Sequence, residues 1–405
     1  MTTVVPAGVF TATAAGARHA TYAALAASGP VHHIALPDGT PGWLVTGRDE
    51  IRALLTDPRF VKTPARGGGP AGGALPADVD AAINTDLLHL DPPDHTRLRR
   101  LVSAAFTRRR VEQLAPRVQQ ITDELLDDLA GRREADLVAT FAYPLPMTVI
   151  CELLGVPEGG RAQFREWSAT IVSGVVAGPA AWVAAATALL GYVRELLAGT
   201  RAAPSDDLLS ALVAVRDGGD RLTEDELTSM VFLLLLAGHE TTVNLIANGV
   251  HALLTHPDQL ALLRAEPERL PAAVEELLRF DGPVQVATFR WTREPVEIAG
   301  VVIPPGEMVI PGLLAANRDA RHVADPERLD LTRPERPHLA FGHGIHHCLG
   351  APLARLEGRI ALGSLLARFP DLRLAVPPSE ILWRPSVLMH GPAALPVSLG
   401  LAEAS

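Results

Sequence analysis

The chain has 405 residues, of which 48% are hydrophobic and 4% aromatic, and its formal net charge is −10. This acidic balance excludes the basic footprint typical of nucleic-acid-binding proteins, and two cysteines, Cys151 and Cys348, cannot build a disulfide framework. The N-terminus lacks the charged and apolar segments of a signal peptide, and the most apolar run, 230–238, is too short to span a bilayer, so we expect a soluble, cytoplasmic protein without membrane contact.

The first ninety residues predict a small sheet followed by an open loop. Residues 31–36 and 42–47 have the pattern of two strands around the turn "PDGTPG". Residues 48–57 predict a short helix that ends before Pro58. The Gly- and Pro-rich segment 63–90 then predicts a long loop, and loops of that length in compact domains are usually functional or disordered.

Helices dominate the middle of the chain. Asp91 and two prolines open a favourable helix start, and residues 109–131 have an amphipathic helical pattern. The longest helical pattern begins at a capping box of Thr223 and Glu226 and ends at Pro257. Its apolar middle predicts a helix that runs through the protein interior.

The last third of the chain mixes strands with helices. Residues 271–283 predict a short helix, the alternation over 284–310 predicts strands, and a long helix follows Cys348. No obvious linker divides the sequence. We therefore expect residues 1–405 to form one mainly α-helical unit with small β-sheets.

The stretch "FGHGIHHCLG", residues 341–350, places Cys348 among three glycines and three histidines. A zinc site is disfavoured, because the adjacent residues His346, His347 and Cys348 cannot readily converge on one tetrahedral ion. A catalytic nucleophile would need a general base and an orienting group, and the loop alone does not exclude it. An axial thiolate to haem explains more, because a helix start stabilises a thiolate and glycines allow close approach to a flat surface.

This stretch resembles the haem-binding loop of the cytochrome P-450 family, and the resemblance runs from about residue 20 to 400. It implies the P-450 fold, a single triangular-prism-like domain with haem b between the long central helix and the helix after Cys348. By the same resemblance Cys348 is the axial ligand of the iron. Phe341 would pack beside its sulfur, and amides near Gly350 would hydrogen-bond that sulfur.

The segment "AGHETT", residues 237–242, resembles the acid–alcohol pair of the family. A carboxylate on a buried helix is costly without a partner or a role. The resemblance implies that Thr241 hydrogen-bonds dioxygen and that Glu240 relays protons for its cleavage. Ala237 and Gly238 are small, and Gly238 permits a kinked or widened helical turn with room for dioxygen.

"EELLR", residues 275–279, contains Glu276 and Arg279, which lie three apart on one helix face. The family has an E-x-x-R pair at this place, buried and completed by a second arginine. The resemblance favours Arg328 as that arginine, with Arg333 as a rival, because Leu329 replaces the aromatic residue usual in the family.

Haem brings two propionates into a buried site, and buried charges need partners of opposite sign. His95 and Arg99 lie four apart on one helix face. The resemblance implies four residues that pair with the propionates: His95, Arg99, Arg290 and His346.

The resemblance is nearest to the actinomycete group that oxidises macrolides, other polyketides and sterol- or vitamin D-like molecules. A mostly aliphatic pocket implies a lipophilic substrate, such as a macrolide or polyketide, a terpenoid or a sterol-like compound. The Gly-rich part of the 63–90 loop is expected to act as a mobile lid. The expected pocket residues are Ile83, Leu87, Leu88, Leu236, Ala237, Val284, Val286, Val387 and Leu388.

The resemblance implies a haem-thiolate monooxygenase that uses O2 and two electrons to hydroxylate or epoxidise its substrate. The sequence has no nicotinamide or flavin fingerprint, so we expect the electrons to come from a ferredoxin with its reductase. "TRRR", residues 107–110, with Arg97 and Arg100, is a candidate dock for such an acidic partner. Two alternatives are a peroxide-using haem enzyme and a catalytically silent haem- or ligand-binding accessory protein, and the complete acid–alcohol pair argues against both.

Overall fold

The computed structural model describes residues 8–63, 77–173, 178–217, 220–334 and 337–400. Its α-helices are α1 (Gly8–Thr11), α2 (Ala17–Ser28), α3 (Arg48–Leu54), α4 (Ala77–Ile83), α5 (Asp94–Ala105), α6 (Arg108–Gln113), α7 (Ala115–Leu129), α8 (Pro144–Leu153), α9 (Arg161–Ser173), α10 (Pro179–Ala202), α11 (Leu208–Ala214), α12 (Glu224–Thr255), α13 (Pro257–Ala265), α14 (Leu270–Phe280), α15 (Leu313–Ala316) and α16 (Ala351–Arg368).

Short strands and helical turns connect these helices. The strands are β1 (Val31–Ala35), β2 (Pro41–Val45), β3 (Phe60–Val61), β4 (Glu134–Asp136), β5 (Arg216–Asp217), β6 (Asp220–Arg221), β7 (Arg290–Thr292), β8 (Val296–Ile298), β9 (Val301–Ile303), β10 (Met308–Pro311), β11 (Arg373–Leu374) and β12 (Pro396–Ser398). A π-helical turn, η1 (Val138–Ala142), precedes α8, and 3₁₀ turns include η4 (Pro267–Arg269) and η5 (Gly344–His346).

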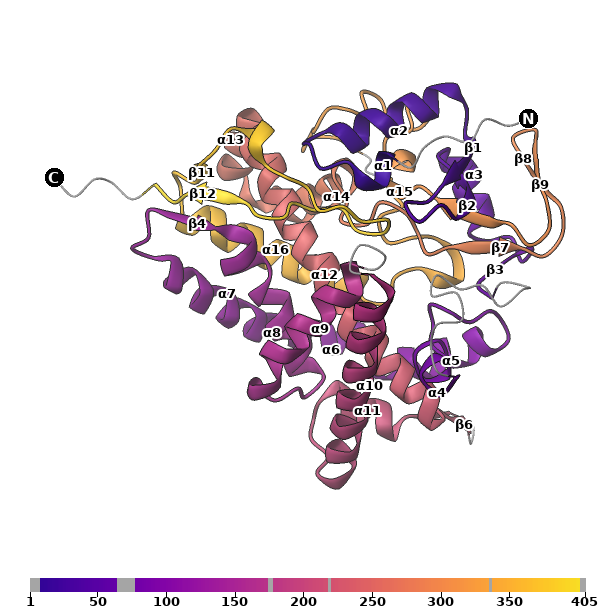
Figure 1. The fold of residues 1–405 in the computed structure, drawn as a ribbon. Coiled ribbons are helices and arrows are strands. Elements are labelled where there is room, and N and C mark those ends of the chain that lie inside the picture. The colour runs from indigo at the N-terminus through magenta and orange to yellow at the C-terminus, as the bar shows by residue number, and fades with distance from the viewer. Residues whose placement is uncertain (1–7, 64–76, 174–177, 218–219, 335–336, 401–405) are drawn as a thin grey trace.

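The ribbon has a roughly triangular outline, with most of the sheet at one corner and helices filling the rest (Figure 1). α12 crosses the middle and packs against α4, α8, α10, α14 and α16. Its start is fixed by the capping box that the sequence predicts, because Thr223 accepts from the Glu226 N–H and the Glu226 side chain accepts from the Thr223 N–H. The interior course predicted for this helix is confirmed, since most of its residues are buried.

The largest sheet has the strand order β1-β2-β10-β7-β3. β1 and β2 form the predicted antiparallel pair, and β10 runs parallel to β2. At the other edge β3 pairs with β7 antiparallel, with Val61 opposite Trp291. The next residue in each direction is Lys62 and Arg290, so this edge places two cations beside each other.

Two sequence predictions about local structure are wrong in part. The segment 63–90 is not a continuous loop, because α4 forms over 77–83, and the Gly-rich residues 64–76 lie outside the described residues. The amphipathic pattern over 109–131 is divided between α6 and α7 at Leu114. Pro116 explains the division, because a residue without an N–H fits the first turn of a new helix better than a helix interior.

Two helices, α10 and α12, are long and apolar enough to cross a membrane by length and composition. About two thirds of the most apolar part of α12 is buried inside the fold, as in a core helix, whereas one third of that part of α10 is buried. Length and composition alone are therefore weak support for a membrane span in this chain.

Candidate active site

The cysteine loop connects the 3₁₀ turn η5 to α16. Gly342 and Gly344 both have φ of +73°, in the left-handed region that favours glycine. A Cβ at Gly344 would lie 2.8 Å from the Leu55 carbonyl oxygen, so the loop approaches the backbone after α3 too closely for any side chain. The Cys348 N–H donates to the Phe341 carbonyl at 2.9 Å and closes the loop. The glycines therefore hold Cys348 at a fixed place just before α16.

The Cys348 side chain is exposed, although protein packed around it still desolvates the thiol and raises its pKa. Four groups act in the opposite direction and lower that pKa. Hydrogen bonds from the backbone N–H groups of Gly350 and Ala351 reach the sulfur, as the resemblance implies, and the charges of Arg99 and Arg355 lie near it. The sulfur is thus accessible, and although burial keeps its pKa raised, the groups around it act to stabilise the thiolate form.

Lys62, Arg290 and three further basic side chains gather on one side of this loop. His95 is 1% exposed, and neither of its ring nitrogens has a partner. Its ring lies 4.3 Å from that of His346, whose Nδ1 contacts the Leu87 carbonyl at 3.0 Å. Arg99 donates to the His347 carbonyl at 2.7 Å.

Arg290 and Lys62 complete this group, which we call the cationic cluster (Lys62, His95, Arg99, Arg290 and His346). Arg290 is 3% exposed and donates to the Thr288 carbonyl at 2.7 Å, while the Lys62 ammonium contacts the Thr288 hydroxyl. Burial and the charge of Arg290 hold the pKa of Lys62 well below its usual value. The same causes lower the pKa of His346 to about 2, with burial first and the charges of Lys62 and Arg290 next.

An acidic residue close to these cations, Asp91, already accepts a hydrogen bond from the backbone N–H of Lys62 at 2.9 Å. It forms no ion pair with a side chain of the cluster among the described residues. The sequence predicts four of the five members, and the structure brings those four together. The sequence analysis missed Lys62, because only the pairing of β3 with β7 in the folded protein brings this residue to Arg290.

The acid–alcohol pair lies in the middle of α12. Thr241 is partly exposed and donates to the Ala237 carbonyl at 3.0 Å, while Ala237 is exposed on a helix that is otherwise mostly buried. Glu240 is 4% exposed and pairs with Arg384 at 2.7 Å, and Arg384 also donates to Asn244 at 3.1 Å. Arg384 was not expected from the sequence, because it lies 144 residues away in an irregular C-terminal segment.

Gly238 does not have the role that the sequence suggests. α12 is an unbroken α-helix over all its 32 residues, without a widened turn. A Cβ at Gly238 would lie 2.7 Å from Ile150 Cδ1, so the glycine allows α8 to pack closely against α12. The face with Ala237 and Thr241 is accessible because the residues are small and turned away from the core.

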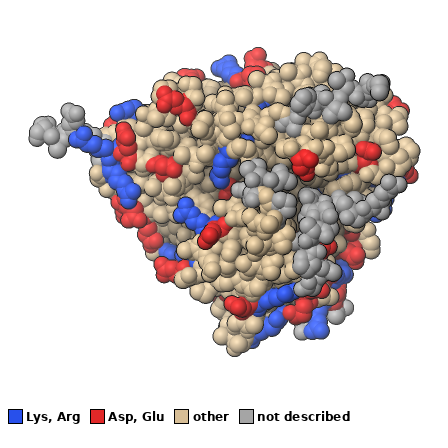
Figure 2. Space-filling model, in the orientation of Figure 1, with Lys and Arg blue, Asp and Glu red and all other residues tan. Residues whose placement is uncertain are grey.

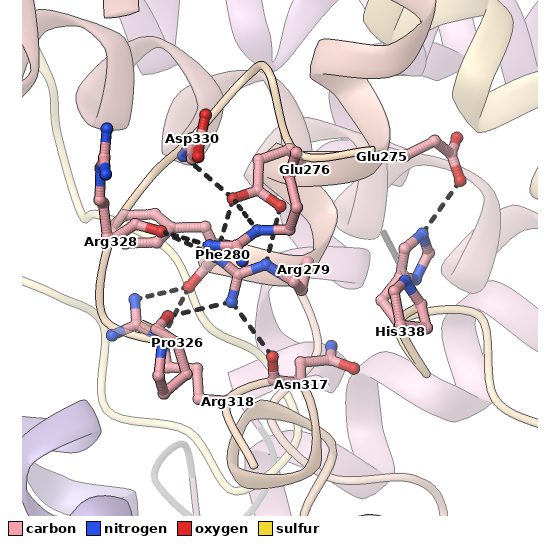
Figure 3. A network of polar contacts seen from close by, with 12 residues as sticks. Glu275, Glu276, Arg279, Phe280, Asn317, Arg318, Pro326, Arg328, Asp330 and His338 are labelled. Carbon is pink, nitrogen blue, oxygen red and sulfur yellow. Dashed lines mark hydrogen bonds and ion pairs between the residues drawn. The ribbon is translucent and has the colours of Figure 1, made fainter. Parts of the chain in front are cut away.

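The E-x-x-R pair is fully buried at the end of α14. Glu276 and Arg279 are both 0% exposed and form two hydrogen bonds, of 2.7 and 2.8 Å (Figure 3). Arg279 also donates to the carbonyls of Asn317, Pro326 and Arg328, at 3.2, 3.0 and 3.1 Å. We call the set of Glu276, Arg279 and Arg333 the arginine lock.

The second arginine of this lock is Arg333, and the expectation that favoured Arg328 is wrong. The Arg333 side chain lies 3.4 Å from Glu276 and also donates to the Ala324 carbonyl at 2.7 Å. Arg328 contributes its backbone carbonyl to Arg279 (Figure 3). Chain spacing alone could not separate the two residues, because both follow the same irregular segment.

One group of three potential metal ligands occurs in the described part of the chain, and it does not include Cys348. His19 and His390 each contact Oδ1 of Asp281 through Nε2 at 2.7 Å. Arg18, which can only donate, lies 3.1 Å from Nδ1 of His390, so Nε2 carries the proton and cannot bind a metal. The group is a hydrogen-bonded clamp, and the zinc interpretation of the cysteine loop finds no ligand set among the described residues.

The expected pocket residues fall into two groups. The first group comes from the segment 83–88 and from α12. Ile83 and Leu87 are buried in the main core, whereas Leu88 and Leu236 are partly exposed. The second group comes from two segments that pair with each other. Residue 284 bridges to residue 389, and the Gln285 N–H donates to the Leu388 carbonyl at 2.9 Å. Val284, Val387 and Leu388 therefore lie on adjacent segments. Val286 is 0% exposed and packs with β-sheet residues, which makes it a core residue rather than a pocket wall.

A cavity of about 450 Å³ lies elsewhere, beside the clamp of His19, Asp281 and His390, with Trp383 and Phe280 in its wall. None of the expected pocket residues lines it. The pocket assignment therefore stays a prediction for the remaining candidates.

Comparison with known proteins decides the family. The family model "Cytochrome P450" matches residues 183–392. The chain is 51% identical over 389 residues to cytochrome P450 107B1 of Saccharopolyspora erythraea, covering 95% of each chain. It is 47% identical to 6-deoxyerythronolide B hydroxylase of the same species, covering 94% of this chain and 95% of that one.

The chain belongs to the cytochrome P450 family. The solved structure of the tirandamycin C-bound P450 monooxygenase TamI superimposes with a TM-score of 0.86 at 46% identity, covering 95% of this chain and 97% of that one. The P450 fold predicted from the sequence is therefore confirmed, and the protein is a haem-dependent monooxygenase that takes O2 and electrons from a redox partner.

The chemistry of the residues themselves, apart from the family comparison, fits a haem group. Buried cations without carboxylate partners match a ligand with two carboxylates, and both unpartnered nitrogens of His95 lie among them. An accessible thiol that receives backbone hydrogen bonds at a helix start matches an axial thiolate. The cationic cluster would hold the propionates, and Cys348 would hold the iron.

Proposed function

We propose that Cys348 is the axial ligand of this P450 monooxygenase, and that the cationic cluster binds the haem propionates. The observation that carries the proposal is a group of basic side chains near an accessible thiol, three of them buried and none with a carboxylate ion-pair partner among the described residues. Bound haem supplies the activation of dioxygen, with the thiolate as electron donor. The chain's own residues bind the group, orient it and move protons.

Proton delivery is assigned to Glu240 and Thr241. The Glu240 carboxylate is buried, but its partner Arg384 is 37% exposed, so the ion pair links the inside of α12 to solvent. Release of Glu240 from Arg384 would let the carboxylate take a proton from water and pass it towards the Thr241 hydroxyl. The hydroxyl, which donates to Ala237 at rest, would turn to hold the oxygen atoms that receive the proton.

Replacement of the alcohol tests this assignment. Thr241→Ala should leave the haem content and the Soret band unchanged, and it should divert electrons from product into hydrogen peroxide by about tenfold. The measurement is the ratio of peroxide to product per electron consumed. Thr242→Ala is the matched control, because the neighbouring threonine is buried at 2% exposure and away from the accessible face. Unchanged coupling in the first variant would remove Thr241 from the mechanism.

The substrate is proposed to be a lipophilic small molecule of the macrolide, polyketide, terpenoid or sterol class, in secondary metabolism such as antibiotic biosynthesis. Support comes from the names of two relatives, one that hydroxylates 6-deoxyerythronolide B and one bound to tirandamycin C. The expected pocket residues are aliphatic, which suits such compounds. Reaction outcomes would be hydroxylation or epoxidation.

Spectral titration of the purified holoprotein identifies the substrate class. Members of the four compound classes are added singly while the Soret band is followed. A shift toward the high-spin form shows that a compound displaces iron-bound water, and the class with the tightest binding is the substrate class. A normal haem spectrum with no shift for any compound would overturn the proposed substrate range.

The electron donor is proposed to be a ferredoxin with its reductase, in the cytoplasm, and exposed arginines support a dock for such an acidic partner. Arg108 and Arg109 begin α6, which packs against α16, the helix that follows the cysteine loop. Both are exposed, whereas Arg97 is paired with Glu226 and Asp220 and is therefore unsuited to docking. On the face in Figure 2, described side chains of both signs are interspersed, so any dock is local.

A further inference from the structure

A second polar cluster lies next to the arginine lock, and the proposed mechanism does not use it. Glu275 precedes Glu276 on α14, yet it points to a different partner (Figure 3). Arg355 of α16 donates to it twice, from Nε to Oε1 at 2.6 Å and from Nη2 to Oε2 at 2.8 Å. This fork-on-fork pairing fixes the plane and position of the guanidinium group.

The fixed guanidinium lies on the aromatic ring beside the cysteine. The Arg355 Cζ atom is 4.4 Å from the centroid of the Phe341 ring, a distance at which a cation is attracted to the ring face. The Phe341 carbonyl accepts the Cys348 N–H at 2.9 Å, so ring and sulfur belong to one small loop. A full positive charge is therefore held near the thiolate.

The two charges affect each other in both directions. Burial raises the pKa of the Cys348 thiol, and the charge of Arg355 acts against that rise. The hydrogen bonds to Glu275 are the main cause that raises the pKa of Arg355, and the thiolate adds to it. Any group that stabilises the negative sulfur reduces the electron density that the sulfur donates to iron. Arg355 should act in that sense at all pH values of interest, because a guanidinium group stays charged.

Glu275 opposes this effect, and it is held in the charged form. Burial raises its pKa, but hydrogen bonds from Arg355 and His338 outweigh burial and lower the pKa to about 2. The Ala340 N–H donates to Nδ1 of His338, which leaves the proton on Nε2 to be donated to Glu275 at 3.0 Å. The carboxylate is thus anchored from two sides and partly cancels the charge of Arg355.

We propose that Arg355, held on the Phe341 ring by Glu275, is a positioning residue that sets the reduction potential of the haem through the Cys348 sulfur. Arg355 raises the potential and Glu275 lowers it. The inference rests on the proposed ligation by Cys348. A role limited to joining α14 with α16 is the competing explanation, and it predicts an effect on stability alone.

Reduction potentials of purified holoproteins distinguish the two explanations. Arg355→Met keeps an apolar stem over the ring and removes the charge, and Glu275→Gln removes the negative charge while its amide oxygen can still accept a hydrogen bond from Arg355. The potential is measured by spectroelectrochemistry with small mediators, so no protein partner takes part. We expect Arg355→Met to lower the potential and Glu275→Gln to raise it, each by about tenfold in the ratio of oxidised to reduced haem, or about 59 mV for one electron.

Two further variants control for shape and for general charge. Arg355→Lys keeps the charge without the fork and should restore most of the potential lost in Arg355→Met. Arg368→Met removes a cation from the far end of the same helix, where Arg368 pairs with Asp127 at 2.6 Å, and should leave the potential unchanged. The free energy of unfolding is measured for every variant.

Three results would overturn the proposal: unchanged potentials with lowered stability, shifts of the two main variants in the same direction, or an equal shift in Arg368→Met. Failure of the underlying ligation has a separate signature. Loss of the thiolate-type Soret band of the reduced carbon-monoxide complex in Cys348→Ser establishes the ligand, and retention of that band refutes the ligation itself rather than the tuning.

Discussion

The arginine lock and the cationic cluster are both buried groups of basic side chains, but only the lock contains a carboxylate that pairs with them. In the lock, Glu276 receives hydrogen bonds from Arg279, Arg333 and the Asp330 N–H, and the remaining donors of Arg279 reach carbonyl oxygens. In the cationic cluster, Lys62 and Arg290 contact a hydroxyl and a carbonyl, and neither ring nitrogen of His95 has a hydrogen-bond partner. Removal of one partner from a paired group leaves a buried charge uncompensated, whereas a group of cations without a counter-charge can gain one from an anionic ligand.

The largest effect on stability is expected where the counter-charge of Arg279 is removed from the lock. Glu276→Gln leaves the guanidinium of Arg279 buried without its counter-charge, so the free energy of unfolding should fall by about 3–5 kcal/mol, with or without haem. Chemical denaturation measures the loss. Glu268→Gln in η4 is the control, since this side chain is exposed and should give a loss near zero. Equal stabilities of the two variants would contradict a structural lock.

In the cationic cluster, loss of a charge is not expected to lower the stability of the apoprotein. Arg290→Met removes an unbalanced buried charge, so the apoprotein should keep its stability or gain about 1 kcal/mol. The holoprotein should lose haem about tenfold faster, because one partner of a propionate is gone. Transfer of haem to an excess of apomyoglobin measures the rate.

The control for this pair of measurements is Arg293→Met, which removes an exposed arginine three residues further along the chain and should change neither quantity. Destabilisation of the Arg290→Met apoprotein by as much as Glu276→Gln would mean that the cluster is a second lock. The comparison between the two regions would then be wrong.

The difference between the regions also explains what sequence reasoning could predict. The capping box, the β1–β2 pair and the E-x-x-R pair depend on residues close in sequence, whose geometry follows from helix or turn spacing. Arg384, Arg333 and Lys62 reach their partners through tertiary packing. Their roles depend on a β3–β7 pairing or an irregular segment, for which sequence periodicity carries no signal.

A third buried group, the clamp of His19, Asp281 and His390, tests whether a change of pH alters the stability that a buried polar group contributes. In the clamp, burial lowers the pKa of His19 to about 4, from 6.5 in the unfolded chain, and the pKa of Asp281 lies well below 3.8. Between pH 6.5 and 4 the unfolded state binds a proton that the folded state does not. The stability that neutral His19 contributes is therefore present above pH 6.5 and lost as the pH falls to 4, by up to roughly 3 kcal/mol.

His19→Gln isolates this contribution, because glutamine can donate to Asp281 but does not titrate. The free energy of unfolding of wild type and variant is measured between pH 4 and 7.5. The difference between the two curves should stay constant above pH 6.5, and below it the wild type should lose stability steadily relative to the variant, by up to roughly 3 kcal/mol at pH 4. Parallel curves over the whole range would show that His19 titrates alike in the folded and unfolded states, and would refute the lowered pKa.

The smallest effect is expected at the surface, where water and salt balance charges that have no protein partner. Arg108→Glu with Arg109→Glu should raise the apparent dissociation constant for a ferredoxin several-fold at low salt, because both side chains are exposed on α6 beside α16. Arg108 contacts only Glu112 at 2.9 Å on the same helix, so the fold should tolerate the change. Arg133→Glu with Arg373→Glu is the matched control for net charge, because it reverses two other exposed arginines. An effect that persists unchanged at high ionic strength would point to lost packing rather than to docking, and the absence of any effect at low salt would place the dock on another surface.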